Sequence, residues 1–244
     1  AKEFRGGVLV MTGANSAVGL RSMPVRYLFL DEVDGYPLDV EGEGDAISLA
    51  EARTRTFARR KIFIVSTPTI SGASAIEREY EASDQRRYFV PCPHCNHPQW
   101  LRFEQLRWDK GQPETAAYIC ESCDTAISEH HKTWMLERGE WQAMAQGKTA
   151  GFHLSSLYSP VGWRSWRDIA AAWEAAVNKE SGSAAAIKTF KNTELGETWV
   201  EEGEAPDWQR LVERREDYRV GTVPQGGLLL VGAADVQKDR IEAS

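Results

Sequence analysis

The four cysteines of this chain have a spacing typical of a metal site. Cys92 and Cys95 form one Cys-x-x-Cys pair, and Cys120 and Cys123 form a second pair after 24 intervening residues. Two such pairs at this separation are typical of a structural four-cysteine zinc ribbon, in which four thiolates complete a tetrahedron around Zn²⁺. We therefore predict a zinc site in a reducing compartment rather than disulfides. A redox dithiol is the alternative, although a redox pair does not need a duplicate.

Other side chains near the cysteines have a plainer interpretation. His94 and His97 lie close enough in sequence to compete as ligands. Four thiolates already fill a tetrahedral site, so we expect both histidines to stay outside it. We expect the nearby aromatic residues to pack the small ribbon, with contact to DNA as the alternative: Trp100, Phe103, Trp108 and Tyr118.

Two adjacent carboxylates, Asp31 and Glu32, follow the apolar run at residues 27–30. A short unbroken apolar run indicates a strand buried on both faces, as in a parallel sheet. The carboxyl end of such a strand is where open α/β sheets bind ligands. In P-loop NTPases an Asp at this point holds Mg²⁺ on the nucleotide phosphates, and a second acid beside it can orient water. A strand that ends in a solvated acidic turn fits these residues equally well.

A second apolar run, residues 61–65, ends in hydroxyl side chains that include Ser66 and Thr67. Such hydroxyls can contact a γ-phosphate or its attacking water, although a hydroxyl-rich turn after a strand is also ordinary. Residues 47–60 between the two runs are predicted to be helical, with a basic C-terminal end. Two strands with a helix between them form a βαβ unit, whose two polar strand ends lie at the same edge of the sheet.

A third candidate is Asp235, at the end of the apolar run 228–236, after which the chain turns into a second predicted strand. An Asp on the first strand of an RNase H-like sheet is a metal ligand in two-metal phosphodiester hydrolysis. The alternative is an ordinary turn carboxylate.

Between the cysteines and Asp235, the sequence predicts two helices and two breaks. Ser165, with Asp168 three residues later, predicts a capped helix whose tryptophans face the core. A second helix is predicted from 184 to 195. The acidic residues 201–206 are typical of a linker, and residues 224–227 form the clearest break.

The composition is that of an ordinary globular protein. Of the 244 residues, 42% are hydrophobic and 27% are charged, and the net charge is −7. This balance excludes a wholly basic nucleic-acid coat but allows a local basic face. No apolar run approaches the ~18 residues of a membrane span, so no membrane partner is expected. The first residues do not resemble a signal peptide, and there is no initiating Met.

Several short motifs in this chain occur in an order that is itself informative. They are Gly13-Ala14-Asn15-Ser16, Leu20-Arg21-Ser22, Leu30-Asp31-Glu32-Val33-Asp34, Gly42-Glu43-Gly44-Asp45, Ala52-Arg53-Thr54, Ser66-Thr67-Pro68-Thr69, the cysteine-containing residues 88–95, and residues 190–199. In this order they resemble the large terminase subunit of tailed phages, of the lambda GpA type. The resemblance implies an ATP-driven DNA-packaging motor with a nuclease domain behind it.

The resemblance also implies roles for individual residues. Asp31 serves Mg²⁺ and Glu32 activates water, as a Walker B pair. Ser66 and Thr67 match the motif that couples hydrolysis to DNA movement. Asp235 becomes a ligand of the divalent metal, Mg²⁺ or Mn²⁺, of the nuclease.

We therefore expect an α/β fold with a partial P-loop NTPase-type parallel sheet, an inserted four-cysteine zinc ribbon and the first strands of an RNase H-like nuclease. The expected segments are the C-terminal half of the ATPase core (1–87), the ribbon (88–140), the end of the ATPase region with a helical linker (141–226) and the start of the nuclease (227–244). No Gly-Lys-Ser or Gly-Lys-Thr occurs in the chain, and in the family the Walker A loop lies upstream. This piece alone is thus expected to be nearly inactive.

Expected partners are double-stranded DNA, the small terminase subunit and the portal of the procapsid, within an oligomeric motor in the host cytoplasm. Two other classes of protein are alternatives: a zinc-ribbon DNA-binding or scaffold protein, and a fragment of a helicase-like ATPase.

Overall fold

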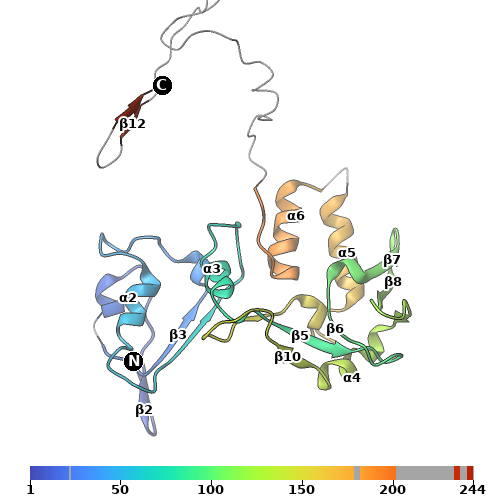
Figure 1. The fold of residues 1–244 in the computed structure, drawn as a ribbon, viewed down its shortest axis with the longest axis horizontal. Coiled ribbons are helices and arrows are strands. Elements are labelled where there is room, and N and C mark those ends of the chain that lie inside the picture. Colours follow the sequence, from blue (N-terminus) through green and yellow to red (C-terminus); the bar gives the residue numbers. More distant parts are fainter. Residues whose placement is uncertain (22, 179–181, 202–233, 237–240, 244) are drawn as a thin grey trace, which may run out of the picture. The chain divides into compact units, whose positions relative to one another are not determined.

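The computed structural model describes residues 1–21, 23–178, 182–201, 234–236 and 241–243 (Figure 1). The chain divides into two units, residues 1–201 and 202–244. The described part of the second unit is an antiparallel hairpin of β12 (Ala234–Val236) and β13 (Ile241–Ala243). This hairpin confirms the second strand predicted after Asp235. Ser22, most of the expected linker (202–206) and the break at 224–227 lie outside the described residues.

The predicted βαβ unit is present in the first unit. Strands β3 (Tyr27–Asp31) and β4 (Lys61–Val65) pair in parallel, with Asp31 opposite Val65. Helix α2 (Ala46–Ala52) connects them. The helix begins after Asp45, whose carboxylate accepts a hydrogen bond from the backbone N–H of Ser48 at 2.9 Å, an N-cap that satisfies a free amide of the first turn.

The sheet is buried on one face only, so the prediction of a strand buried on both faces is wrong. Leu30 and its neighbours pack against α2 and α1 (Ala17–Arg21). Phe29 and Phe63 point the other way and are 71% and 55% exposed. Successive side chains of a strand alternate between faces, and in the described residues the helices cover just one of them.

The helix predicted for residues 47–60 is shorter than expected. It ends at Ala52, where Arg53 and Thr54 donate backbone hydrogen bonds three residues back instead of four. The hydroxyl of the buried Thr54 bonds the carbonyl of Glu51 at 2.8 Å. This local bond competes with a continued helix, so the basic residues lie in the turns that lead to β4.

The cysteine-containing segment forms two small sheets. In the first, β5 pairs with three partners, and in the second β8 lies between β7 and β9. The strands are β5 (Arg86–Pro91), β6 (Pro98–Trp100), β7 (Leu106–Asp109), β8 (Gln112–Ile119), β9 (Ala126–Ile127), β10 (Glu140–Gln142) and β11 (Phe152–His153).

The remaining elements complete the first unit. An exposed hairpin of β1 (Lys2–Phe4) and β2 (Gly7–Leu9) opens the chain. The other helices are α3 (Ala75–Glu81), α4 (Lys132–Glu137), α5 (Trp166–Val177) and α6 (Ala184–Phe190), followed by a π-helical turn, η5 (Lys191–Leu195). The short 3₁₀ turns are Val33–Gly35, Phe103–Gln105, Glu129–His131 and Ser156–Tyr158. The predicted capping box at Ser165 and Asp168 is confirmed.

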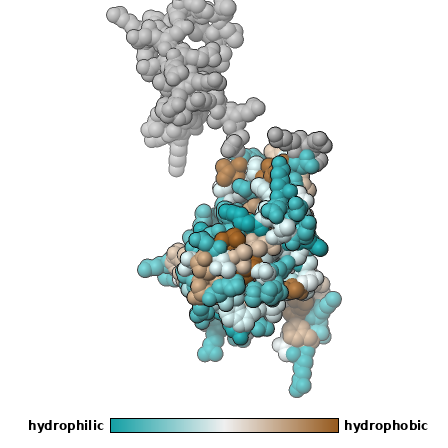
Figure 2. All heavy atoms as spheres, turned by 90° about the vertical axis from the view of Figure 1, so that its right-hand side faces the viewer, coloured by the Kyte–Doolittle hydropathy of each residue, from teal (hydrophilic) through white to brown (hydrophobic). Residues whose placement is uncertain are grey.

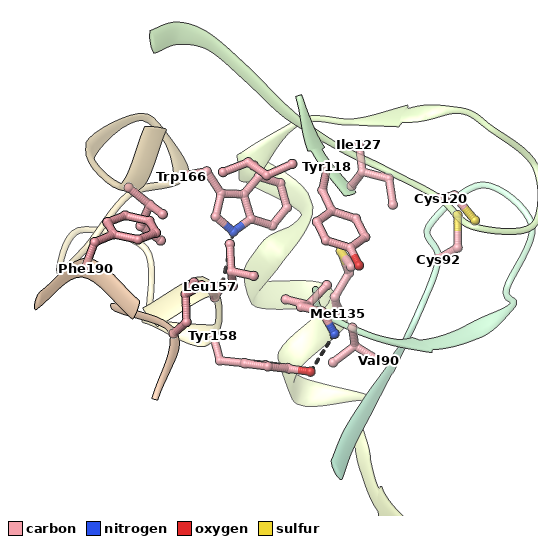
Figure 3. Close-up of a cluster of buried hydrophobic side chains, with 14 of the residues drawn as sticks. Val90, Cys92, Tyr118, Cys120, Ile127, Met135, Leu157, Tyr158, Trp166 and Phe190 are labelled. Atoms are coloured by element: carbon pink, nitrogen blue, oxygen red, sulfur yellow. Dashed lines mark hydrogen bonds between the residues drawn. The ribbon is translucent and has the colours of Figure 1, made fainter. Parts of the chain in front are cut away.

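One hydrophobic core joins the cysteine segment to helices α5 and α6 (Figure 3). Tyr118 and Ile127 come from the small sheets, and Trp166 and Phe190 come from the helices. The side chain of Trp166 is fully buried, and its indole N–H donates to the carbonyl of Leu157 at 3.0 Å. The expected segment 88–140 therefore shares a core with the described helices between residues 166 and 190.

The surface around this core is mixed in character. On the face that Figure 2 presents, hydrophilic and apolar residues are interspersed. None of the helices in the described part of the chain has the length and apolar character needed to cross a membrane. The mixed architecture with small sheets confirms the α/β part of the expected fold class.

Candidate functional site

The parallel pairing brings the first two groups of candidate residues to one sheet edge. Asp31 is the last residue of β3 and Glu32 follows it, while Ser66 and Thr67 directly follow β4. Asp31, Glu32 and Thr67 are exposed. Carboxylates and hydroxyls thus lie at the carboxyl ends of adjacent parallel strands, where α/β sheets bind ligands.

Glu32 has a left-handed backbone conformation, with φ 54° and ψ 48°. This conformation costs a non-glycine residue about 1–2 kcal/mol, so the surrounding structure must hold it. The 3₁₀ turn Val33–Gly35 follows at once, and the N–H of Gly35 donates to the Glu32 carbonyl at 2.9 Å. Strained residues of this kind are common at functional sites.

Asp34 is a site residue that the sequence did not single out. Its backbone N–H donates to the Ser66 hydroxyl at 3.1 Å. Its carboxylate accepts hydrogen bonds from the N–H and the hydroxyl of Thr69, at 2.9 and 2.8 Å, and from the N–H of Ile76 at 2.8 Å. Asp34 therefore ties the turn after β3 to the turn after β4. The sequence signal that could have identified Asp34 is that it is a third acidic residue close to the end of β3.

The four cysteine sulfurs form a compact cluster, with all four Sγ atoms within 4.8 Å of one another. The Cys92–Cys123 and Cys95–Cys120 sulfurs are 3.9 and 3.7 Å apart. A tetrahedron with metal–sulfur bonds of about 2.3 Å has sulfur–sulfur edges of about 3.8 Å. These two distances fit a tetrahedral metal site, so the cluster could hold a metal ion.

The two cysteine pairs sit on turns of the same geometry. In the first, the backbone N–H of Cys92 bonds the carbonyl of His97, and the N–H of His94 points at the Cys92 sulfur at 3.4 Å. The second turn repeats both bonds at Cys120. Asn96 and Asp124, each directly after the second cysteine of its pair, have positive φ values of 63° and 53°. Backbone amides aimed at the sulfurs favour thiolates there.

Neighbouring polar groups support the cluster. The buried Gln99 accepts the N–H of Glu121 at 3.0 Å and so links the two cysteine turns. Hydrogen bonds with Thr125 lower the pKa of the Cys123 thiol to about 6. His97 instead contacts Glu121 at 3.1 Å, and His94 lies against His131. The group of possible metal ligands formed by the four cysteines includes neither histidine.

Asp235 lies in β12, opposite Glu242 of β13. Its side chain lies outside the described residues, so the role predicted for it stays a prediction.

Comparison with known proteins gives two family matches. The family described as phage terminase large subunit gpA, ATPase domain, matches residues 1–141, and the terminase large subunit gpA endonuclease domain matches residues 149–244. No solved structure matches the chain.

Two curated relatives are similar along nearly the whole chain. The large terminase subunit of Enterobacteria phage P21 is 32% identical over 268 residues, covering 99% of this chain and 41% of the relative. That of Escherichia phage lambda is 30% identical over 258 residues, covering 94% and 39%. The chain thus spans about two fifths of the length of these relatives. By these matches, the chain belongs to the GpA family of phage terminase large subunits.

Proposed function

We propose that this chain forms part of a DNA-packaging motor that hydrolyses ATP, moves double-stranded DNA into a procapsid and cuts concatemeric DNA. The observation that supports this best is the shared sheet edge. Asp31 and Glu32 lie beside Ser66 and Thr67 at the carboxyl ends of parallel strands, within the segment that matches the ATPase family. The match of residues 149–244 to the endonuclease family supports the cutting activity.

In this proposal the residues at the strand ends have different roles in ATP hydrolysis. Asp31 is an exposed carboxylate, an oxygen ligand of the kind that Mg²⁺ prefers. Held by Asp31 together with ATP, Mg²⁺ would neutralise charge on the phosphates. Glu32 orients the attacking water and accepts its proton. Ser66 and Thr67 respond to the state of the phosphates, and Asp34 passes that response between the two turns.

We propose that the four cysteines hold one structural Zn²⁺ in a zinc ribbon. Sulfur–sulfur distances of 3.7 and 3.9 Å fit a tetrahedral site. Four protein ligands leave no open coordination position, so the site stabilises the fold and takes no part in catalysis. Gln99 fixes the two cysteine turns relative to each other.

We further propose that Asp235 is a ligand of the nuclease metal, Mg²⁺ or Mn²⁺, in an RNase H-like sheet. Its position on a strand of an antiparallel hairpin within the segment that matches the endonuclease family supports this. The P-loop NTPase-type core (1–87), the zinc ribbon (88–140), the helical region (141–226) and the start of the nuclease (227–244) are proposed as functional segments. Residues 88–140 and the described helices between 166 and 190 share a core.

The proposed partners follow from this activity. They are double-stranded DNA, the small terminase subunit and the portal of the procapsid, within an oligomeric motor in the cytoplasm of the bacterial host. DNA contact through phosphates makes binding strongly salt-dependent.

The test is DNA packaging by a full-length large subunit that contains this sequence, supplied with its small subunit, procapsids and ATP. DNA protected from DNase is measured for the parent protein, for Glu32→Gln and for Glu41→Gln. Glu41 is a matched control because it is exposed and also has a positive φ, 55°. We expect protection to be lost only in Glu32→Gln. Equal protection in all three proteins would refute the proposal.

A further inference from the structure

Thr69 is held from two sides by groups far apart in the sequence. On one side, the Asp34 carboxylate accepts its N–H and its hydroxyl at 2.9 and 2.8 Å. On the other side, its carbonyl accepts the side-chain N–H of Asn192 at 2.7 Å and the backbone N–H of Trp199 at 2.9 Å. Thr69 thus cannot shift without breaking bonds on one side or the other.

Asn192 is suited to hold this turn rigidly. Its amide nitrogen donates to two consecutive carbonyls, those of Pro68 and Thr69. The side chain is 8% exposed, so water competes little for these bonds and they count for more than surface bonds. Two acceptors for one amide group also fix its orientation.

The backbone around Asn192 is unusual. It lies in the π-helical turn Lys191–Leu195 that continues α6. π-helical turns are rare overall, but those that do occur are often found at functional sites. On either side, Phe190 and Leu195 are buried in the core shared with the cysteine segment, and the Phe190 ring packs 5.2 Å from that of Trp173. A displacement of Asn192 must therefore move α6 against that core.

The hydrogen bonds link two segments that match different families. Thr69 belongs to the segment that matches the ATPase domain, and Asn192 belongs to the segment that matches the endonuclease domain. Trp199 adds a backbone link, since it forms a parallel bridge with Ile70 and its carbonyl accepts the N–H of Ser71 at 2.9 Å. These contacts join the strand-end turn of the βαβ unit directly to the helical segment.

We propose that Asn192 is a positioning residue that couples the strand-end turn at residues 66–69 to α6 and its core. A change at Asp31 and Glu32 reaches Asn192 through the Asp34 carboxylate and the backbone carbonyl of Thr69, and so moves the helical segment. The inference rests on the proposed function, because it needs a hydrolysis cycle at the strand ends. Asn192 contacts no reacting atom in this scheme. It therefore affects how much DNA is packaged per ATP hydrolysed rather than the rate of hydrolysis.

The test compares Asn192→Leu with Thr193→Val in a full-length large subunit that contains this sequence. Leu keeps the approximate size of Asn without its amide. Thr193 is a matched control in the same π-helical turn, since its hydroxyl bonds the Thr189 carbonyl, at 2.8 Å, within the helix. ATP hydrolysis and DNase-protected DNA are measured on the same samples. We expect Asn192→Leu to hydrolyse ATP normally while the DNA packaged per ATP falls by about tenfold, a typical coupling between two sites.

Each other outcome has a distinct meaning. Unchanged packaging per ATP in Asn192→Leu would overturn the coupling role. The coupling role would also be overturned if Asn192→Leu unfolds at the same temperature as the parent protein but loses both ATP hydrolysis and packaging. Asn192 would then serve the hydrolytic site. Absence of ATP hydrolysis in the parent protein would instead refute the proposed function.

A second measurement covers the case in which Asn192→Leu does not fold. In ¹H–¹⁵N spectra of this chain, Asp34→Asn is expected to shift the side-chain amide signals of Asn192 through Thr69. The side-chain signals of Gln99, in the cysteine segment, are expected to stay in place. Unshifted Asn192 signals would overturn the link.

Discussion

Replacement of Cys120 by serine is expected to abolish zinc binding and to loosen the cysteine segment. Cys120 is fully buried, and its sulfur lies 3.7 Å from that of Cys95, close to the edge of about 3.8 Å expected for a tetrahedral four-sulfur site. A serine hydroxyl is a much harder and weaker ligand for Zn²⁺ than a thiolate. The site is then left with three thiolates.

The size of the effect follows from where the site lies. Structural zinc contributes about 10–16 kcal/mol of apparent binding free energy in small zinc domains, whereas a whole domain is stable by only about 5–15 kcal/mol. The cysteine turns also pack on the core that includes Tyr118 and Trp166, and this packing remains. We therefore expect the two cysteine turns and β9 to lose structure while α5 stays folded.

The assay is native mass spectrometry of the purified chain for zinc content, combined with hydrogen–deuterium exchange of its peptides. The parent chain is expected to carry one zinc, and Cys120→Ser none, with fast exchange in residues 92–97 and 120–127. Ser122→Ala is the matched control, because Ser122 is exposed in the same turn and is not a ligand in the proposed site. A parent chain without zinc, or a Cys120→Ser chain that still carries one zinc, would refute the reasoning.

Three further predictions concern stability, measured by denaturant unfolding. Burial, together with the charge of Arg87, lowers the pKa of His153 to about 4. The stabilising contribution of the neutral imidazole is therefore complete above the unfolded pKa of about 6.5 and is lost as the pH falls toward 4, and His153→Gln should flatten this pH dependence by roughly 3 kcal/mol. Glu129→Ala should cost about 3 kcal/mol, because it leaves the fully buried ammonium of Lys132 without its 2.5 Å partner. Tyr158→Phe should cost about 2 kcal/mol, because its hydroxyl joins two backbone groups at 2.6 and 2.7 Å. Effects below about 0.5 kcal/mol would contradict each of these assignments.

The sequence predicted the features that depend on local pattern. Apolar runs of strand length with polar ends indicated β3, β4 and their parallel pairing, and cysteine spacing indicated the four-sulfur cluster. The capping box at Ser165 was readable because its partner lies three residues away. Each of these signals lies within a few residues or in a well-known spacing.

Features that depend on distant packing were not predictable. The carboxylate of Asp34 finds its partners only when the parallel register places residue 69 beside it, 35 positions along the chain. Asn192 meets the strand-end turn across 123 positions, and nothing local marks the π-helical turn that holds it. The exposure of Phe29 likewise depends on which face of the sheet the helices cover.

The most direct test of the strand-end assignment is the rate of ATP hydrolysis by a full-length large subunit that contains this sequence, compared with its Glu32→Gln and Glu41→Gln variants. Loss of a general base lowers a rate by about 10²–10⁴-fold. We expect such a fall in kcat for Glu32→Gln, with nucleotide binding retained, and an unchanged rate for Glu41→Gln. Hydrolysis at the parent rate in Glu32→Gln would contradict the assignment of the β3 strand end as the hydrolytic site.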